Sequence, residues 1–120
     1  MEICVVARTK NMLNDYAKAL ADAGIRAYEV KRDKTDDRNM PGVRTATMHR
    51  VKGLEFTCMF IVGMNKGNMP YKYVVDKASD EVSREETITS ERSLLYVALT
   101  RAKKMTYVSG YGKLSELITD

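Results

Sequence analysis

The chain has 120 residues, of which 44% are hydrophobic and 30% are charged. This length suits one compact domain, and this composition excludes an intrinsically disordered chain. The formal net charge is +4. A mild basic excess is compatible with a phosphate-rich partner but does not require one.

Cysteine and histidine usage argues against metal binding. Cys4 and Cys58 both lie in apolar runs and form no Cys-x-x-Cys pair, which favours buried, reduced thiols and a cytoplasmic location. His49 is the single histidine, so we expect no metal site. No segment is long enough to cross a membrane, and residues 1–7 lack the basic region of a secretory signal. The abrupt apolar start suggests that the chain was cut from a longer protein.

The first elements predict a buried strand followed by a helix. Ile3 to Ala7 is a continuous run rich in branched residues, typical of a parallel sheet. Thr9 can cap the next helix, and Gly24 ends it. Apolar residues recur between them at helical spacing: Leu13, Tyr16, Leu20 and Ala23.

The middle of the chain predicts three strands and two connections. Arg26 to Val30 is typical of a short strand, and the charged, turn-rich Lys31 to Gly42 indicates an exposed connection. Val43 to Met48 alternates and predicts a strand. Thr57 to Met64 is strongly apolar and predicts a central strand, followed by a turn over Asn65 to Pro70.

The last third predicts one long loop, one clear helix and a final strand. Tyr71 to Thr89 is polar and predicts a long loop that holds at most one short helical piece. Ser90 to Lys103 predicts a helix with an apolar stripe. Met105 to Ser109 predicts a strand, and Leu114 to Ile118 a closing helical turn. The residues of the stripe are Leu95, Ala98, Leu99 and Ala102.

Strands that alternate with helices predict an α/β fold with βαβ units and a mostly parallel sheet covered on both faces. Ligands of such sheets bind beyond the carboxyl ends of the strands. We therefore expect the loops after Ala7, Met48, Met64 and Ser109 to carry the function.

The segment Thr47 to Phe56 concentrates polar chemistry between two predicted strands. Its sequence is Thr-Met-His-Arg-Val-Lys-Gly-Leu-Glu-Phe. Gly53 permits close backbone approach to a ligand, and such a turn can hold phosphates by its donors and a sugar hydroxyl by Glu55. The alternative is a polar loop with a terminating glycine, and the residue chemistry alone leaves both open.

Arg101 lies one to two turns after Leu94 and Val97, near the margin of the predicted apolar stripe of the last helix. A helix-held, partly desolvated guanidinium suits contact with a transferring phosphoryl group. The helical pattern alone favours the alternative, an arginine that packs its stem on apolar neighbours or forms an ion pair.

Three stretches resemble UvrD/Rep-type superfamily 1 DNA helicases, in the order of that family. Thr47 to Phe56 resembles helicase motif V, and Phe60 to Met64 with Gly67 and Pro70 resembles the strand and turn after it. Glu91 to Ala102 resembles motif VI, Glu-Arg-x-Leu-x-Tyr-Val-x-x-Thr-Arg-Ala. Val5 to Asn11 resembles the opening of the second RecA-like domain. Together the matches cover most of the chain.

The resemblance implies a fold and a set of nucleotide contacts. Residues 1–120 would form the C-terminal RecA-like domain, a three-layer domain of the P-loop NTPase type without a Walker A loop. Arg101 would match the catalytic arginine finger that contacts the γ-phosphate of ATP. Glu55 would match the acid that contacts the nucleotide sugar, and Gly53 the backbone near the phosphates.

The resemblance also implies contacts with single-stranded DNA. Thr47 and His49 would match positions near the DNA backbone. Arg8 would bind DNA or support domain packing, and Lys52 would at least support the motif V loop. The implied partners are single-stranded DNA and the N-terminal RecA-like domain of the same protein, with no membrane.

Departures from the family pattern are peripheral except for two absences. Ser90 replaces an acid before motif VI, and Asn68-Met69 replaces an apolar pair before Pro70. The accessory domain that many relatives insert is absent at about residues 31–42. No Gly-x-x-x-x-Gly-Lys-[Ser/Thr] loop occurs, so ATP and Mg²⁺ would be bound mainly by the N-terminal half. We therefore expect the chain alone to hydrolyse ATP negligibly.

The implied function is half of an ATP-dependent DNA helicase or translocase, moving 3′ to 5′. The alternative from another class is a stand-alone, non-catalytic module that binds single strands or a partner protein. An RNA helicase or a helicase–nuclease subunit of the same superfamily is a third reading. The sequence leaves the biological pathway and the oligomeric state open.

Overall fold

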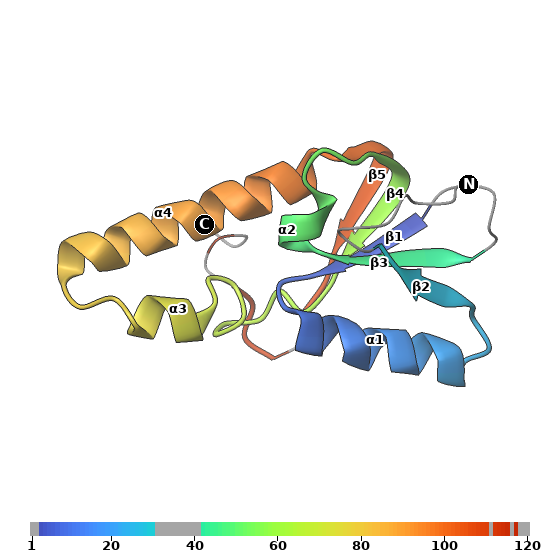
Figure 1. Cartoon of the computed structure of the whole chain (residues 1–120), viewed down its shortest axis with the longest axis horizontal. Coiled ribbons are helices and arrows are strands. Elements are labelled where there is room, and N and C mark those ends of the chain that lie inside the picture. The colour runs from blue at the N-terminus through green and yellow to red at the C-terminus, as the bar shows by residue number, and fades with distance from the viewer. Residues whose placement is uncertain (1–2, 31–41, 111, 116, 118–120) are drawn as a thin grey trace.

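The computed structural model of the chain describes residues 3–30, 42–110, 112–115 and 117. Its strands and helices, labelled in Figure 1, follow in this order: β1 (Ile3–Ala7), α1 (Lys10–Asp22), β2 (Ala27–Glu29), β3 (Val43–Thr47), α2 (Met48–Val51), β4 (Phe56–Ile61), α3 (Lys72–Asp76), α4 (Glu81–Leu99) and β5 (Ala102–Val108). The strands form one five-stranded sheet in the order β2-β3-β1-β4-β5, in which every neighbouring pair is parallel. The predicted α/β fold with a mostly parallel sheet is confirmed.

Hydrophobic clusters on both faces of the sheet give the domain three layers. On one face, Val5 and Ala7 of β1 pack with Leu13 of α1. On the other face, Cys4 and Val6 of the same strand pack against α2 and α4. The buried residues that these two helices contribute are Met48, Val51, Leu95 and Ala98. Alternate residues of one strand serve opposite faces because successive strand side chains point in opposite directions.

Local signals placed the first two elements correctly. β1 spans the predicted Ile3–Ala7, and the Thr9 hydroxyl accepts a hydrogen bond from the Met12 amide at 3.3 Å to cap α1. The helix ends before Gly24, which has φ +80°. Cys4 and Cys58 are both buried, as expected.

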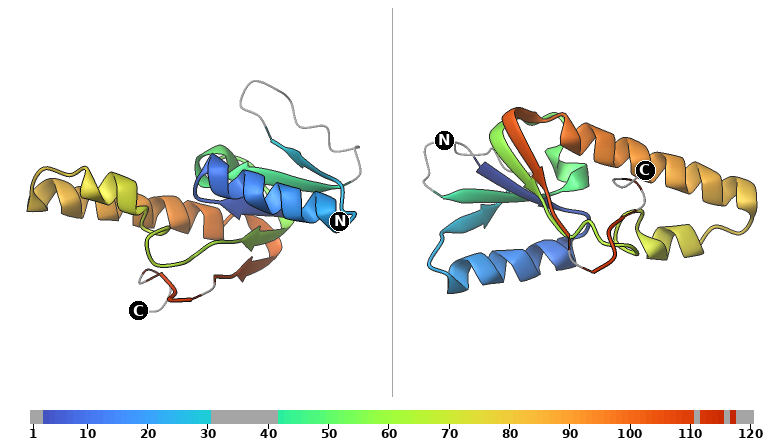
Figure 2. Two further views of the ribbon diagram at one scale, coloured as in Figure 1. Left: turned by 90° about the horizontal axis from the view of Figure 1, so that it is seen from below. Right: turned by 180° about the vertical axis from the view of Figure 1, so that it is seen from behind.

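The predicted loop over residues 71–89 is mostly helical, which corrects the prediction. Its short helical piece is α3, but α4 already begins at Glu81, where the Asp80 carboxylate caps it by accepting from the Ser83 amide at 2.7 Å. The first half of α4 runs out beyond the sheet with α3 alongside (Figures 1 and 2). A helical segment that does not pack on a sheet needs no continuous apolar stripe. The sequence of this segment therefore resembles that of a polar loop.

The end of α4 is a second correction, because the helix stops at Leu99 instead of Lys103. Ala102 already pairs with Phe56 as the first residue of β5. Alanine and lysine are good helix formers, so the sequence pattern continued the helix. Pairing with β4 decides the matter, and it places Arg101 in a turn between helix and strand.

Two smaller differences concern strand ends. The strand predicted to end at Met48 ends at Thr47, and the short α2 follows without a break. The strand predicted over 57–64 spans Phe56–Ile61. The predicted connection over 31–42 lies outside the described residues except for Gly42. Of the predicted closing turn over 114–118, only residues 114, 115 and 117 are described.

Candidate functional site

The candidate site residues fall at opposite edges of the sheet. All carboxyl ends of parallel strands share one edge, and all amino ends share the other. Residues that end or follow β1 and β3 form a carboxyl-edge group: Arg8, Thr47 and His49. Residues that precede β4 and β5 form an amino-edge group: Gly53, Glu55 and Arg101. The expectation that the carboxyl ends carry the function therefore covers only the first group.

Arg8 forms a buried ion pair with Glu91 of α4. Its Nε and Nη2 donate to the two carboxylate oxygens at 2.9 and 2.8 Å, and the two side chains are 9% and 6% exposed. The same carboxylate accepts from the Tyr71 amide at 2.7 Å, and the Arg8 guanidinium lies 5.2 Å from the centroid of the Tyr71 ring. This network ties β1, the start of α3 and the middle of α4 together.

Thr47 and His49 mark the start of α2. The Thr47 hydroxyl caps α2 by accepting from the Arg50 amide at 3.3 Å. The His49 side chain is exposed at this edge. Partial burial and the nearby Arg8 charge lower the pKa of His49 from its ordinary 6.5, while Glu91 acts in the opposite direction. A lowered pKa keeps the imidazole mostly neutral at pH 7, so it can donate from one nitrogen and accept at the other.

Gly53 lies in the turn that leads from α2 into β4. Gly53 has φ +84°, and a β-carbon there would meet no heavy atom within 4 Å. The backbone conformation, not crowding, therefore requires glycine. Glu55, two residues later, is exposed and directly precedes β4.

The amino-edge group is assembled by strand pairing. The Phe56 amide donates to the Arg101 carbonyl at 3.2 Å, which sets the residue after Glu55 directly beside Arg101. Arg101 is half-buried, and its Nε lies 3.4 Å from the Val97 carbonyl, a long hydrogen bond. A cation, a carboxylate and an open glycine at one edge can contact phosphates and sugar hydroxyls.

A groove runs between α2 and α4 from one edge toward the other. It has a volume of about 390 Å³, and its lining residues are His49, Lys52, Thr89, Ser90, Glu91, Ser93, Leu94 and Val97. His49 belongs to the carboxyl-edge group, and Lys52 directly precedes Gly53 of the amino-edge group. The groove therefore runs from one residue of the carboxyl-edge group to the chain neighbour of Gly53.

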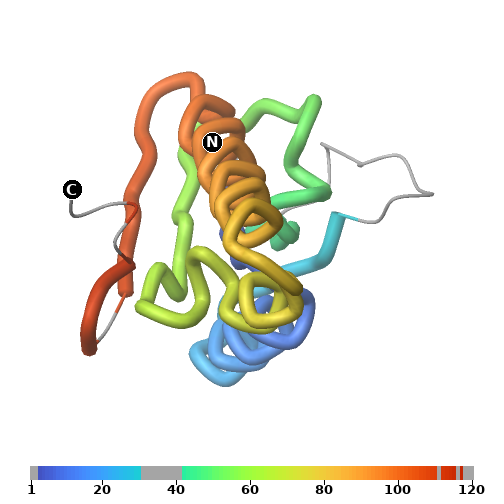
Figure 3. Tube along the Cα trace, turned by 90° about the vertical axis from the view of Figure 1, so that its left-hand side faces the viewer, coloured from blue at the N-terminus to red at the C-terminus, as the bar shows by residue number. Residues whose placement is uncertain are grey.

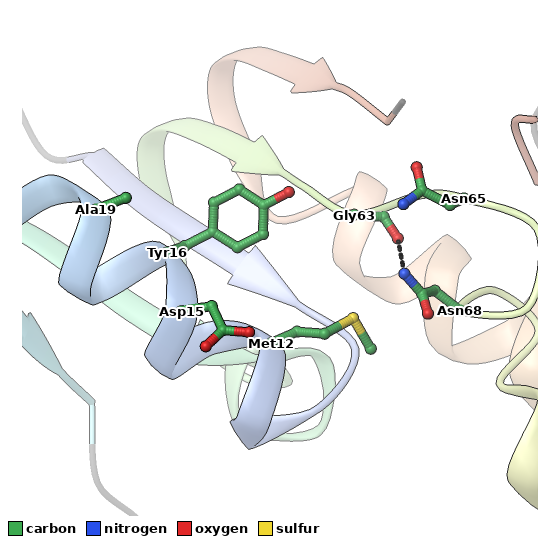
Figure 4. Close-up of a pocket in the computed structure, with 7 residues that line it drawn as sticks. All are labelled: Met12, Asp15, Tyr16, Ala19, Gly63, Asn65 and Asn68. Atoms are coloured by element: carbon green, nitrogen blue, oxygen red, sulfur yellow. Dashed lines mark hydrogen bonds between the residues drawn. The ribbon is translucent and has the colours of Figure 1, made fainter. Parts of the chain in front are cut away.

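A second hollow lies on the α1 side of the sheet and contains none of the candidate residues. Figure 4 shows its lining between α1 and the turn after β4: Met12, Asp15, Tyr16, Ala19, Gly63, Asn65 and Asn68. Its volume is about 260 Å³. The Asn68 amide donates to the Gly63 carbonyl at 3.2 Å and so braces the turn.

The described part of the chain contains no group of three or more His, Cys, Asp or Glu side chains that could hold a metal ion. Among its helices, none is both long and apolar enough to cross a membrane.

Comparison with known proteins gives the family. The sequence model of the UvrD-like helicase C-terminal domain matches residues 1–113. The chain belongs to this family. In fold, it is similar to the crystal structure of the C-terminal domain of a possible DNA helicase from Lactobacillus plantarum WCFS1. The TM-score is 0.66 at 22% identity, and the match covers 98% of this chain and 60% of that one.

Curated relatives are named as ATP-dependent DNA helicases. The chain is 37% identical over 110 residues to the putative ATP-dependent DNA helicase YjcD of Bacillus subtilis, and it covers 13% of that protein. It is 40% identical over 77 residues to the ATP-dependent DNA helicase PcrA of Staphylococcus epidermidis and covers 10% of it. This UvrD-like domain thus spans only a small part of the relatives that it matches.

Glu91 is the residue whose role the sequence reasoning missed. It lies within the stretch matched to motif VI but received no function of its own. A signal was available, because Glu91 precedes Leu95 by four residues and Ala98 by seven, so it falls on the buried stripe. A carboxylate on a buried stripe requires a partner, and here the partner is Arg8.

Proposed function

We propose that this UvrD-like domain is the C-terminal RecA-like half of an ATP-dependent DNA helicase or translocase. Its amino-edge group completes an ATP site whose phosphate-binding loop and Mg²⁺ ligands lie in the N-terminal RecA-like half. The observation that carries the proposal is the pairing of Phe56 with Arg101, which brings an acid and an arginine from distant motifs to one edge.

In this mechanism, residues of this domain bind ATP that is held by the N-terminal half, and so draw the two RecA-like halves together. Arg101 contacts the γ-phosphate of ATP, Glu55 contacts the sugar, and Gly53 lets the backbone approach the phosphates. Closure of the two halves on ATP, followed by opening after hydrolysis, then moves the protein along single-stranded DNA, with 3′ to 5′ as the proposed direction.

The carboxyl-edge group would face the DNA. Thr47 and His49 are proposed to lie along the DNA backbone, with Thr47 acting chiefly by fixing the start of α2. Arg8 is mostly buried against Glu91, which favours its role in domain packing over a direct phosphate contact. Binding is expected to weaken with salt and to show little sequence preference.

The test is ATP hydrolysis by the full-length protein in the presence of single-stranded DNA. Arg101→Ala is expected to lower turnover by about 10³-fold or more while DNA binding is retained. Arg92→Ala is the matched control, because Arg92 is an exposed arginine of α4, the helix that ends just before Arg101. A loss below about tenfold for Arg101→Ala would make Arg101 structural and favour the non-catalytic module.

A further inference from the structure

A third hollow lies at the outer end of α4, away from the candidate residues described above. The turn after β4, α3 and the first turns of α4 enclose about 460 Å³. This volume lies within the range of about 300–1,000 Å³ that is usual for ligand pockets. Figure 3, which looks along α4, shows α3 beside the first turns of that helix. The floor is apolar, with Met69 fully buried and Val75 8% exposed.

Three cations and one carboxylate line this hollow. Lys66, Lys72 and Arg84 come from the turn, from α3 and from α4, and Asp76 is the single acid. Within the described residues, none of the four takes part in an ion pair. The other acids at the start of α4 (Glu81, Glu85 and Glu86) are exposed but do not line the hollow. Three unpaired cations over an apolar floor favour an anionic ligand with an apolar body.

Two residues that line the hollow, Lys66 and Lys72, connect it to the carboxyl edge. Lys72 directly follows Tyr71, whose amide donates to Glu91 and whose ring lies under the Arg8 guanidinium. Lys66 lies after β4, at the edge where Arg8 follows β1 and Thr47 ends β3. A strand of nucleic acid that passes the carboxyl-edge group would therefore reach the hollow without crossing the sheet.

We propose that this hollow binds single-stranded DNA, with Lys66, Lys72 and Arg84 on backbone phosphates and the apolar floor against a sugar or base. The assignment rests on the proposed function and extends the DNA track to α3 and the outer half of α4. Single-stranded DNA fits the chemistry because each nucleotide offers one phosphate for the cations and an apolar face for the floor.

The test measures how binding of a fluorescein-labelled oligothymidylate to the full-length protein depends on salt. A variant that can no longer neutralise one phosphate should show a slope of log affinity against log salt that is smaller by about 0.7. Lys72→Gln/Arg84→Gln should therefore reduce it by about 1.4. Between about 50 and 200 mM salt, the affinity advantage of the wild type should then shrink about sevenfold. Lys18→Gln/Lys104→Gln, which removes two exposed cations on α1 and β5, is the matched control.

Asp76→Asn provides a result that misfolding cannot imitate. Removing the single carboxylate of the hollow should tighten oligothymidylate binding several-fold with little change in slope, because repulsion disappears while the same cations neutralise the same phosphates. Unchanged melting temperatures by circular dichroism would show that all variants keep the fold.

Three outcomes overturn the proposal, and they are distinguishable. If Lys72→Gln/Arg84→Gln has the same slope as the wild type, and the wild type binds the oligothymidylate, then DNA does not bind at the hollow, while the proposed function still holds. An equal or larger loss on a blunt duplex assigns the hollow to duplex DNA and rejects the single strand as its occupant. A wild-type protein without single-strand binding overturns the proposed function and this inference together.

Discussion

Removal of the Glu91 carboxylate should be among the most destabilising single changes in this domain. Glu91→Ala leaves the Arg8 guanidinium buried without a counter-ion, which costs about 3–5 kcal/mol in comparable sites. The Tyr71 amide is also left without its acceptor, for about 1 kcal/mol more. The sum of about 4–6 kcal/mol is a large part of the roughly 5–15 kcal/mol that usually stabilises a domain.

The assay is urea unfolding followed by far-ultraviolet circular dichroism, with Glu86→Ala as the control. Glu86 is exposed on the same helix, so its replacement should change the free energy of unfolding by no more than about 0.5 kcal/mol. Arg8→Met/Glu91→Leu should recover most of the missing stability, because no charge then remains buried. The reasoning is wrong if Glu91→Ala unfolds within about 1 kcal/mol of Glu86→Ala, since the ion pair would then contribute no more than a surface pair.

Two further predictions concern the candidate residues. His49 is the single histidine, so its proton resonances can be followed without ambiguity, and their titration midpoint should fall below 6.5. Because the unfolded state then binds the proton more readily, this residue should lower stability as pH falls from 6.5 through the folded-state pKa; a midpoint at or above 6.5 contradicts this. Gly53→Ala should cost about 1–2 kcal/mol in urea unfolding, because alanine resists the positive φ. Gly24→Ala, at a similar φ in equally open space, should cost about the same, but only Gly53→Ala should raise the KM for ATP; equal KM values would remove Gly53 from the nucleotide site.

The sequence by itself determined the family, the parallel sheet and most element positions. Strand β1 and the cap of α1 follow from a branched apolar run and a threonine, which act through neighbouring residues. The motif V and VI resemblance was readable for the same reason, since each motif is one short, continuous stretch of chain. Features of this kind depend on neighbouring residues only, so they can be predicted without knowing which distant segments come into contact.

Only the tertiary structure decided where the candidate residues lie relative to one another. Arg101 was predicted on a helix, but pairing of β5 with β4 places it in a turn beside the residue after Glu55. The outer half of α4 has no sheet beneath it, so its polar residues form no helical stripe. Arg8 and Glu91 form their ion pair because β1 and α4 pack together. The residue pattern within either segment gives no information about this contact. These positions are set by contacts between segments that are distant in the sequence. The free energy of such a contact depends on both segments together, so the sequence of either segment alone does not predict it.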